Sequence, residues 1–187
     1  MKKISRIAAV AALFATASAW AVNTSQDTSA VLTITGSVTQ QNSACAVSLT
    51  KSSITLSSDV SNIVTQGEDA TFIEPVAVSI TDESGNWSQS CQQAIDQNQL
   101  AIRFTGTADN SEGSVLANMA STDGAASGVG VGIFSQAKQP ISVNTGVMKL
   151  MDSNNGGIFG LQLVKLKNQT VTTGKVSSVV TVEIVRL

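Results

Sequence analysis

Apolar and polar residues alternate along the segment that precedes the first cysteine. Between positions 28 and 38, small or apolar residues occupy one register and threonine or serine fills most of the other. A period of two is typical of a β-strand that buries one of its faces. The predicted buried face consists of Thr28, Ala30, Leu32, Ile34, Gly36 and Val38.

The chain ends on a second alternating strand, whose predicted buried face is Val176, Ser178, Val180, Val182 and Ile184. Clusters of Gly, Asn and Asp separate further apolar runs and predict turns between them. Short strands at this spacing favour an antiparallel sandwich in a single domain. A short helix is expected only at 92–99, and the intervening strands are expected at 54–56, 72–80, 100–106, 128–134 and 159–166.

The first 21 residues have the pattern of a secretory signal peptide. Lys2, Lys3 and Arg6 precede an apolar stretch, Ile7 to Ala17, and small residues that favour cleavage after Ala21 follow it. The apolar stretch is shorter than the roughly 20 residues of a transmembrane helix. Cleavage leaves 187 − 21 = 166 residues, and we expect this mature chain to be exported.

The mature chain is weakly acidic. The signal peptide holds three of the eleven basic residues and none of the thirteen acidic ones, so the mature balance is 8 − 13 = −5. No basic stripe is present in the sequence, which argues against nucleic acid as a partner.

Two cysteines, Cys45 and Cys91, remain after cleavage. An even count in an exported chain favours one disulfide. It closes a loop of 91 − 45 = 46 residues, for which the chain-entropy estimate is roughly 4 kcal/mol of stabilisation. Two free thiols or a pair of metal ligands are the alternatives, and the lack of histidine and of a CxxC motif disfavours the metal.

The residue types argue against an enzyme. Without histidine, neither a Ser/His/Asp nor a Cys/His nucleophile system can be built, and a metal site is restricted to oxygen ligands. Two acidic pairs, Glu68–Asp69 and Asp82–Glu83, are candidates for acid/base work or calcium, against the simpler reading of solvated loops. The glycines of 128–132 predict a closely packed strand, because no Lys-Ser/Thr follows them as in a phosphate loop. Trp87 is expected to anchor its loop. No cofactor is predicted.

Taken in order, several segments resemble pilin subunits of the chaperone–usher fimbrial family, of the type 1-like kind. The resemblance covers the mature chain, and Gly174 is the fourteenth residue from its end, where such pilins carry a glycine. Arg186 stands where the family usually has a penultimate tyrosine, and the longer segment 82–90 predicts an added surface loop. The matching segments are Leu32–Val38, Ser43–Val47, Leu100–Asp109, Gly128–Ile133 and Val171–Gly174.

The resemblance implies an all-β, incomplete immunoglobulin-like antiparallel sandwich, completed by a donor strand from another subunit. Residues 22–38 become the donor extension and 39–187 the pilin domain. The expected partners are identical or related pilins, a periplasmic chaperone and an outer-membrane usher, with export through the periplasm to a surface fimbrium. The strand-accepting groove, which the chaperone also contacts, is expected at Gly174, Val176, Val180, Val182 and Ile184.

Three other functions remain open from the sequence. The chain can be a minor or adhesive subunit that binds a host ligand, although a single domain with its own donor strand argues against a two-domain tip adhesin. It can be a secreted sandwich that pairs its N-terminal strand within the same chain and never polymerises. An enzyme is the third alternative, and the sequence offers no catalytic groups for it.

Overall fold

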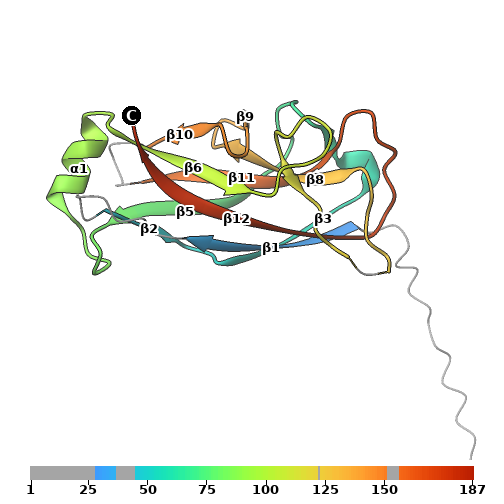
Figure 1. Cartoon of the computed structure of the whole chain (residues 1–187), viewed down its shortest axis with the longest axis horizontal. Coiled ribbons are helices and arrows are strands. Elements are labelled where there is room, and N and C mark those ends of the chain that lie inside the picture. Colours follow the sequence, from blue (N-terminus) through green and yellow to red (C-terminus); the bar gives the residue numbers. More distant parts are fainter. Residues whose placement is uncertain (1–27, 37–44, 122, 151–155) are drawn as a thin grey trace, which may run out of the picture.

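The computed structural model describes residues 28–36, 45–121, 123–150 and 156–187, and for 28–36 it describes the backbone alone. Two β-sheets face each other in an elongated sandwich (Figure 1). The first sheet has the strand order β10-β6-β12-β1-β3. Its strands are β1 (Thr28–Gly36), β3 (Ser53–Ser58), β6 (Leu100–Gly106), β10 (Val147–Lys149) and β12 (Lys175–Arg186).

The second sheet has the order β2-β5-β11-β8-β7, with β4 beside β11 and β9 beside β8. Its strands are β2 (Ala46–Leu49), β4 (Val64–Thr65), β5 (Glu74–Thr81), β7 (Leu116–Ala117), β8 (Val129–Ser135), β9 (Pro140–Ile141) and β11 (Gly156–Lys165). A 3-10 turn, η1 (Val60–Asn62), precedes β4, and the helix α1 (Gln89–Asp96) lies at one end of the sandwich.

The core fills the space between the two sheets. Phe104 of β6 and Phe159 of β11 meet there, with ring centroids 4.8 Å apart and planes tilted by 59°, a geometry that aromatic pairs favour. Both rings are fully buried. Around them lie alternate residues of both sheets, among them Val76, Val78, Ile102, Val131 and Leu161.

The strand β8 is buried on both faces, which explains its lack of polar alternation. Val131 and Ile133 face the main core, whereas Phe134 packs in a second cluster with Val164 and Leu166. Gly130 has no room for a side chain, because a Cβ atom there would lie 2.7 Å from the carbonyl oxygen of Leu116. The expected closely packed strand at 128–134 is therefore present, one residue later at each end.

Several boundaries differ from the sequence expectation. The strand expected at 72–80 begins at Glu74, because the Phe72 side chain is 67% exposed and its N–H donates to the Gln162 side chain instead of to a sheet. The helix begins at Gln89 instead of 92, after the Ser88 hydroxyl caps it. Strands of two to four residues are too short to show an alternating pattern, so the sequence did not predict β2, β4, β7, β9 and β10.

Most strand pairs in the two sheets are antiparallel, as expected for this sandwich. Two pairs depart from this pattern: β4 runs parallel to β11, and β1 runs parallel to β12. The second exception concerns the predicted donor strand.

Candidate functional site

The candidate site is the space beside β12 in the first sheet, where the N-terminal strand lies. Eight consecutive residues of β1 align with β12, from Ser29 beside Lys175 to Gly36 beside Val182. On its other side β1 pairs with β3, from Thr28 beside Ser58 to Thr33 beside Ser53. Figure 1 shows β1 lying lengthwise between these two strands.

The face of β12 that alternation predicts to be buried does point into the core. Val176 and Ser178 are each 2% exposed, Val180 and Val182 are fully buried, and Ile184 is half-buried against the same cluster. The hydroxyl of Ser178 donates to the carbonyl oxygen of Ala117 at 2.7 Å, so this polar group is satisfied inside the sandwich. The intervening Val179 is 42% exposed.

Gly174 lies immediately before β12, at a point where the backbone of another segment approaches closely. A Cβ atom at Gly174 would lie 2.4 Å from the carbonyl oxygen of Gly124 and 2.5 Å from the nitrogen of Ala126. The N–H of Lys175 donates to Gly124, and that of Ala126 donates to Lys175. Glycine is therefore required here by the packing of the 124–126 segment.

Removal of β1 would open the sandwich. Within the part of the chain that the structure describes, β12 pairs with β6 on one side and with β1 on the other, and β3 reaches this sheet through β1. Without β1, the backbone groups on one side of β12 would lose their partners beside an apolar core. An exposed edge of this kind is a template for pairing with another strand.

The strand that contains the predicted donor residues therefore pairs with two strands of its own chain in this structure. The pairing that the sequence expectation assigned to a neighbouring subunit is made by the chain itself. Thr28, Ala30, Leu32, Ile34 and Gly36 belong to β1, whereas Val38 and the signal peptide lie outside the described residues. That the alternate β1 side chains fill the core stays a prediction, because only their backbone is described.

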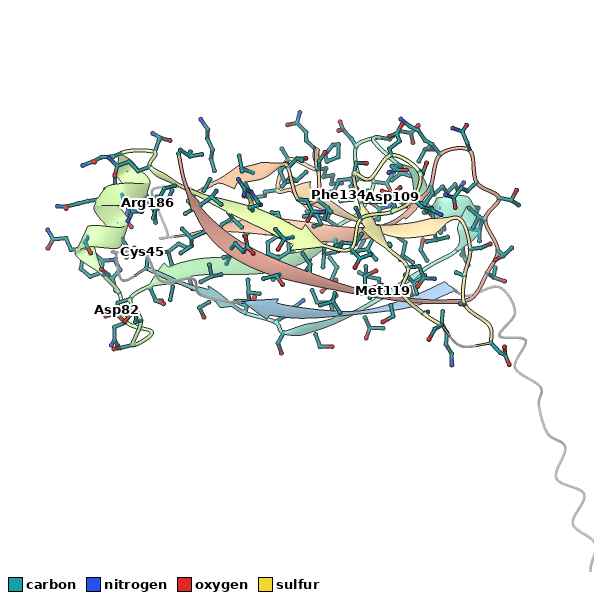
Figure 2. All side chains as sticks on the ribbon, viewed as in Figure 1. Cys45, Asp82, Asp109, Met119, Phe134 and Arg186 are labelled. Carbon is teal, nitrogen blue, oxygen red and sulfur yellow. A yellow bond between two sulfur atoms is a disulfide. The ribbon has the colours of Figure 1, made fainter. Side chains whose placement is uncertain are left out.

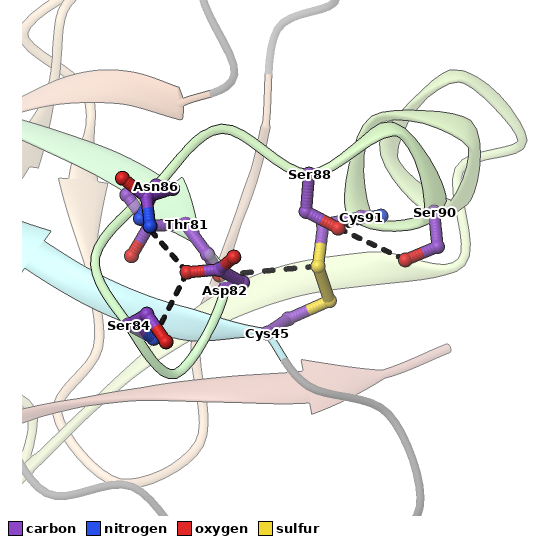
Figure 3. The surroundings of a disulfide bond; sticks show 8 residues. All are labelled: Cys45, Thr81, Asp82, Ser84, Asn86, Ser88, Ser90 and Cys91. Carbon is purple, nitrogen blue, oxygen red and sulfur yellow. Dashed lines mark hydrogen bonds between the residues drawn. A yellow bond between two sulfur atoms is a disulfide. The ribbon is translucent and has the colours of Figure 1, made fainter.

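A disulfide ties α1 to the start of β2. Cys45 and Cys91 form a disulfide with their Cα atoms 5.8 Å apart, which joins the start of β2 to the helix. Figure 3 shows the bond beside Thr81, whose carbonyl oxygen lies 3.9 Å from the Sγ atom of Cys91. Of the three alternatives left by the sequence, the disulfide is the one present.

The segment 82–88 is a surface loop held by one carboxylate. The Oδ1 atom of Asp82 accepts hydrogen bonds from the N–H groups of Ser84 and Asn86 at 2.9 and 2.8 Å (Figure 3). Trp87 is 63% exposed, so the expectation that it anchors the loop is wrong; the Asp82 side chain performs that task. The pair Asp82–Glu83 thus includes a structural residue.

Glu68 has a comparable local role, since its Oε2 atom accepts from the N–H of Thr65 at 2.9 Å. Among the described residues, no group of three or more Cys, Asp or Glu side chains is placed to hold a metal ion. Glu68 and Asp82 thus each accept hydrogen bonds from backbone groups of their own loops, as the solvated-loop reading predicts.

A buried polar network that the sequence analysis did not single out lies far from Arg186, toward the other end of the sandwich (Figure 2). The fully buried Gln66 donates from Nε2 to Asp109 at 3.0 Å and to Ser114 at 2.9 Å. Its Oε1 atom accepts from the N–H of Lys167 at 3.3 Å. No local sequence pattern could have predicted this network, because Gln66 and Asp109 are 43 positions apart and only the fold brings them together.

The Asp109 carboxylate is the centre of that network. Burial raises its pKa, but hydrogen bonds from the N–H groups of Val115, Ser111 and Glu112 and from the Gln66 side chain outweigh burial, so the pKa is lowered from its ordinary value. The carboxylate closes the 109–115 loop. Its role is structural.

The comparison with known protein families agrees with this architecture. Residues 32–185 match the family described as Fimbrial protein, which spans β1 through nearly all of β12. No curated protein matches the chain in sequence. No helix in the described part of the chain has the length and hydropathy needed to cross a membrane. The chain belongs to the fimbrial protein family, whose members are structural proteins of surface appendages that assemble with other pilin subunits.

Proposed function

We propose that this chain is a structural subunit of a chaperone–usher fimbria that polymerises by donor-strand exchange and supports adhesion of the bacterium. The observation that carries the proposal is the position of β1. A strand at the N-terminal end of the described chain fills a lengthwise gap between β12 and β3, and no other described strand pairs with that side of β12.

An exchange of this strand between copies is physically simple. Every backbone hydrogen bond that β1 makes within its own chain can be made by the same segment of a second copy, because the sequences are identical. Addition of a strand to an open sheet edge is an established mode of peptide recognition. Donation from each copy to the next does not close on itself, and it therefore produces a filament.

The same gap suits a periplasmic chaperone. A subunit whose β1 is not yet inserted has an unpaired β12 edge beside Val176, Val180 and Val182, which are buried when the sheet is complete. A partner that lends a strand there would prevent aggregation during export. The proposed route runs through the periplasm to an outer-membrane usher, after removal of the signal peptide 1–21.

The test compares two deletions in cells that produce the subunit, its chaperone and its usher. Deletion of 22–34 removes most of the donor strand, and we expect chaperone-bound subunits but no fibres. Deletion of 22–27 leaves β1 complete and is the matched control, which should still polymerise. Fibre formation by the two deletion variants is measured by electron microscopy and by the SDS-resistant ladder of unheated samples.

Fibres formed by the 22–34 deletion would contradict donor-strand exchange by this segment. If the deletion variant fails to fold even with the chaperone, β1 serves only its own chain, as in a secreted sandwich that does not polymerise. If the intact chain occurs only singly at fibre tips, it is a minor or adhesive subunit instead of a shaft component.

A further inference from the structure

The outer strand of the first sheet, β3, has a free edge. It stands last in the order β10-β6-β12-β1-β3, and within the described residues only β1 pairs with it. We propose that two copies of this chain pair through these edges, β3 against β3, in an antiparallel contact with two-fold symmetry. This association goes beyond the proposed function, because it uses neither the donated strand nor the edge of β12.

The sequence of β3 lacks two features that commonly protect such an edge. Soluble proteins place charged residues or proline on free edges to prevent pairing with another chain. The six residues Ser53–Ser58 include no charge and no proline. The inner side chains Ile54 and Leu56 are buried, whereas the outer residue Thr55 between them is exposed. The free side of the β3 backbone is therefore open to a second strand of the same pattern.

A groove of about 320 Å³ lies beside this edge and offers space for the second strand. Residues 55–58 of β3 line it together with residues of other segments, among them Phe72 and Glu74. Phe72 is 67% exposed, and its N–H donates to the Gln162 side chain, which holds the residue at the groove. Aromatic residues are enriched at protein–protein contacts. A copy that pairs with β3 thus meets an apolar ring next to the strand.

The charges that flank β3 select the direction of the contact. Lys51 precedes the strand and Asp59 follows it, and both are exposed. A parallel pair in register would place like charges side by side, which is destabilising. An antiparallel pair centred on Thr55 places Lys51 of each copy beside Asp59 of the other, which is stabilising. Lys51 also pairs with Glu74 of its own chain, and its ammonium group has donors for a second carboxylate.

The same register matches the two faces of the strand. With Thr55 opposite its counterpart, Ile54 faces Leu56, and each exposed hydroxyl residue faces another. A shift by one residue would put the inner side chains of one copy beside the outer ones of the other, because side chains alternate along a strand. Among the registers that keep the faces matched, this one pairs opposite charges at both ends.

A single contact of this size is weak. An isolated pair of strands is marginally stable in water, so free subunits are expected to pair only at high concentration. On a fibre the contact would recur at every subunit, and many weak contacts then act together. If the proposed function holds, the consequence is lateral association of fibres that run in opposite directions, because β3 pairs antiparallel.

Disulfide trapping of the purified mature chain tests the pairing without requiring fibres. In the proposed register the two copies of residue 55 are opposite, with Cα atoms about 4.5–5.5 Å apart, which a disulfide can span. We expect Thr55→Cys to give cross-linked dimers under mild oxidation. The matched control is Ser53→Cys, on the same exposed face. Its two copies would lie roughly 14 Å apart, and we expect roughly tenfold less dimer from it.

Charge reversal tests the register. Thr55→Cys/Asp59→Lys and Thr55→Cys/Lys51→Asp each bring like charges together at both ends of a homodimer. Each should therefore form about fivefold less dimer than Thr55→Cys alone. A mixture of the two variants restores opposite charges at both ends, so the heterodimer, identified by its mass, should recover. Thr55→Cys/Glu83→Lys controls for net charge, because Glu83 is exposed in the 82–88 loop.

Equal dimer yields from Thr55→Cys and Ser53→Cys would overturn the inference. A mixture that gives no more heterodimer than the separate variants give homodimer would overturn it as well. Failure of the proposed function gives a different result, in which no fibres form but the Thr55→Cys cross-link and its dependence on charge persist. If fibres form and the cross-link does not, the proposed function stands and the β3 contact is refuted.

Discussion

Gln66 and Asp109 meet inside the sandwich, where the amide of Gln66 donates to the carboxylate of Asp109 at 3.0 Å although 43 residues separate them. Asp109 is 6% exposed and Gln66 is fully buried. The contact joins the segment after β4 to the loop before β7, and its two residues differ in how they respond to acid.

We predict that Asp109→Asn destabilises the subunit by roughly 1–3 kcal/mol at neutral pH, because the amide nitrogen would face the N–H groups that the carboxylate now accepts from. The pKa of Asp109 is lowered in the folded chain, so its contribution is fully present above the unfolded pKa, about 4. It is lost as the pH falls through the folded pKa. Urea unfolding of wild type and Asp109→Asn at pH 7 and pH 3 measures the contribution of Asp109 to the free energy of unfolding.

The difference in unfolding free energy between wild type and Asp109→Asn should therefore shrink as the pH falls from 7 to 3. A difference that stays constant over this range would show that the ionised form of Asp109 is not what stabilises the loop.

A second prediction concerns the disulfide. Cys45→Ser removes a bond that closes a 46-residue loop, and the chain-entropy estimate is a loss of roughly 4 kcal/mol. We expect less folded subunit in the periplasm, measured by immunoblot of periplasmic extracts. Thiol labelling of wild type provides the check, because two reactive thiols in the assembled protein would contradict the pairing of Cys45 with Cys91.

A third prediction separates the two faces of β12. Val182→Asp places a charge at a fully buried position, whereas Val179→Asp places it at one that is 42% exposed. An unpaired buried charge is strongly destabilising, so the first variant should fail to fold or to be captured by the chaperone. The second should resemble wild type, and Ile184→Asp, at a half-buried position, should behave like Val182→Asp. Co-purification with the chaperone measures all three; normal capture of Val182→Asp would refute the groove.

A fourth prediction concerns Gly174. Gly174→Ala should destabilise the sandwich, because its Cβ atom would collide with the backbone of 124–126 at 2.4 to 2.6 Å. Gly157→Ala is the control: the nearest atom to its Cβ would be the flexible tip of Met148, at 3.2 Å, and Val78 would lie at 4.0 Å. The midpoints of thermal unfolding of the two purified variants are compared. Equal midpoints would show that the backbone of 124–126 shifts to accommodate the added Cβ atom at little cost.

A fifth prediction concerns Gly36, which lies beside Val182 at the end of β1. We expect Gly36→Leu to reduce multimer formation, since the groove is proposed to leave no space for a side chain there, while the chaperone-bound subunit still folds. Thr35→Val, on the adjacent residue of the same strand, is the control. Fibre yield per folded subunit is measured, and an unchanged yield for Gly36→Leu would remove the proposed role of this glycine.

Alternation along the chain was sufficient to predict β6 and the inward face of β12. Val176, Val180 and Val182 are buried as their register predicts, and β6 has the predicted bounds, because a period of two follows directly from strand geometry. The pairing of Cys45 with Cys91 followed from there being two cysteines. Short strands such as β7 and β9 could not be predicted, since two residues contain no period.

Contacts between distant segments were decided by tertiary structure. Nothing local in Gln66 or Asp109 indicates that they meet, because Gln66 reaches Asp109 and Ser114 across more than 40 residues of sequence. The partner of β1 is the clearest case. Its alternating residues require a sheet edge, but an identical edge exists on the same chain and on every other copy. In this structure β1 pairs with the β12 of its own chain, in parallel.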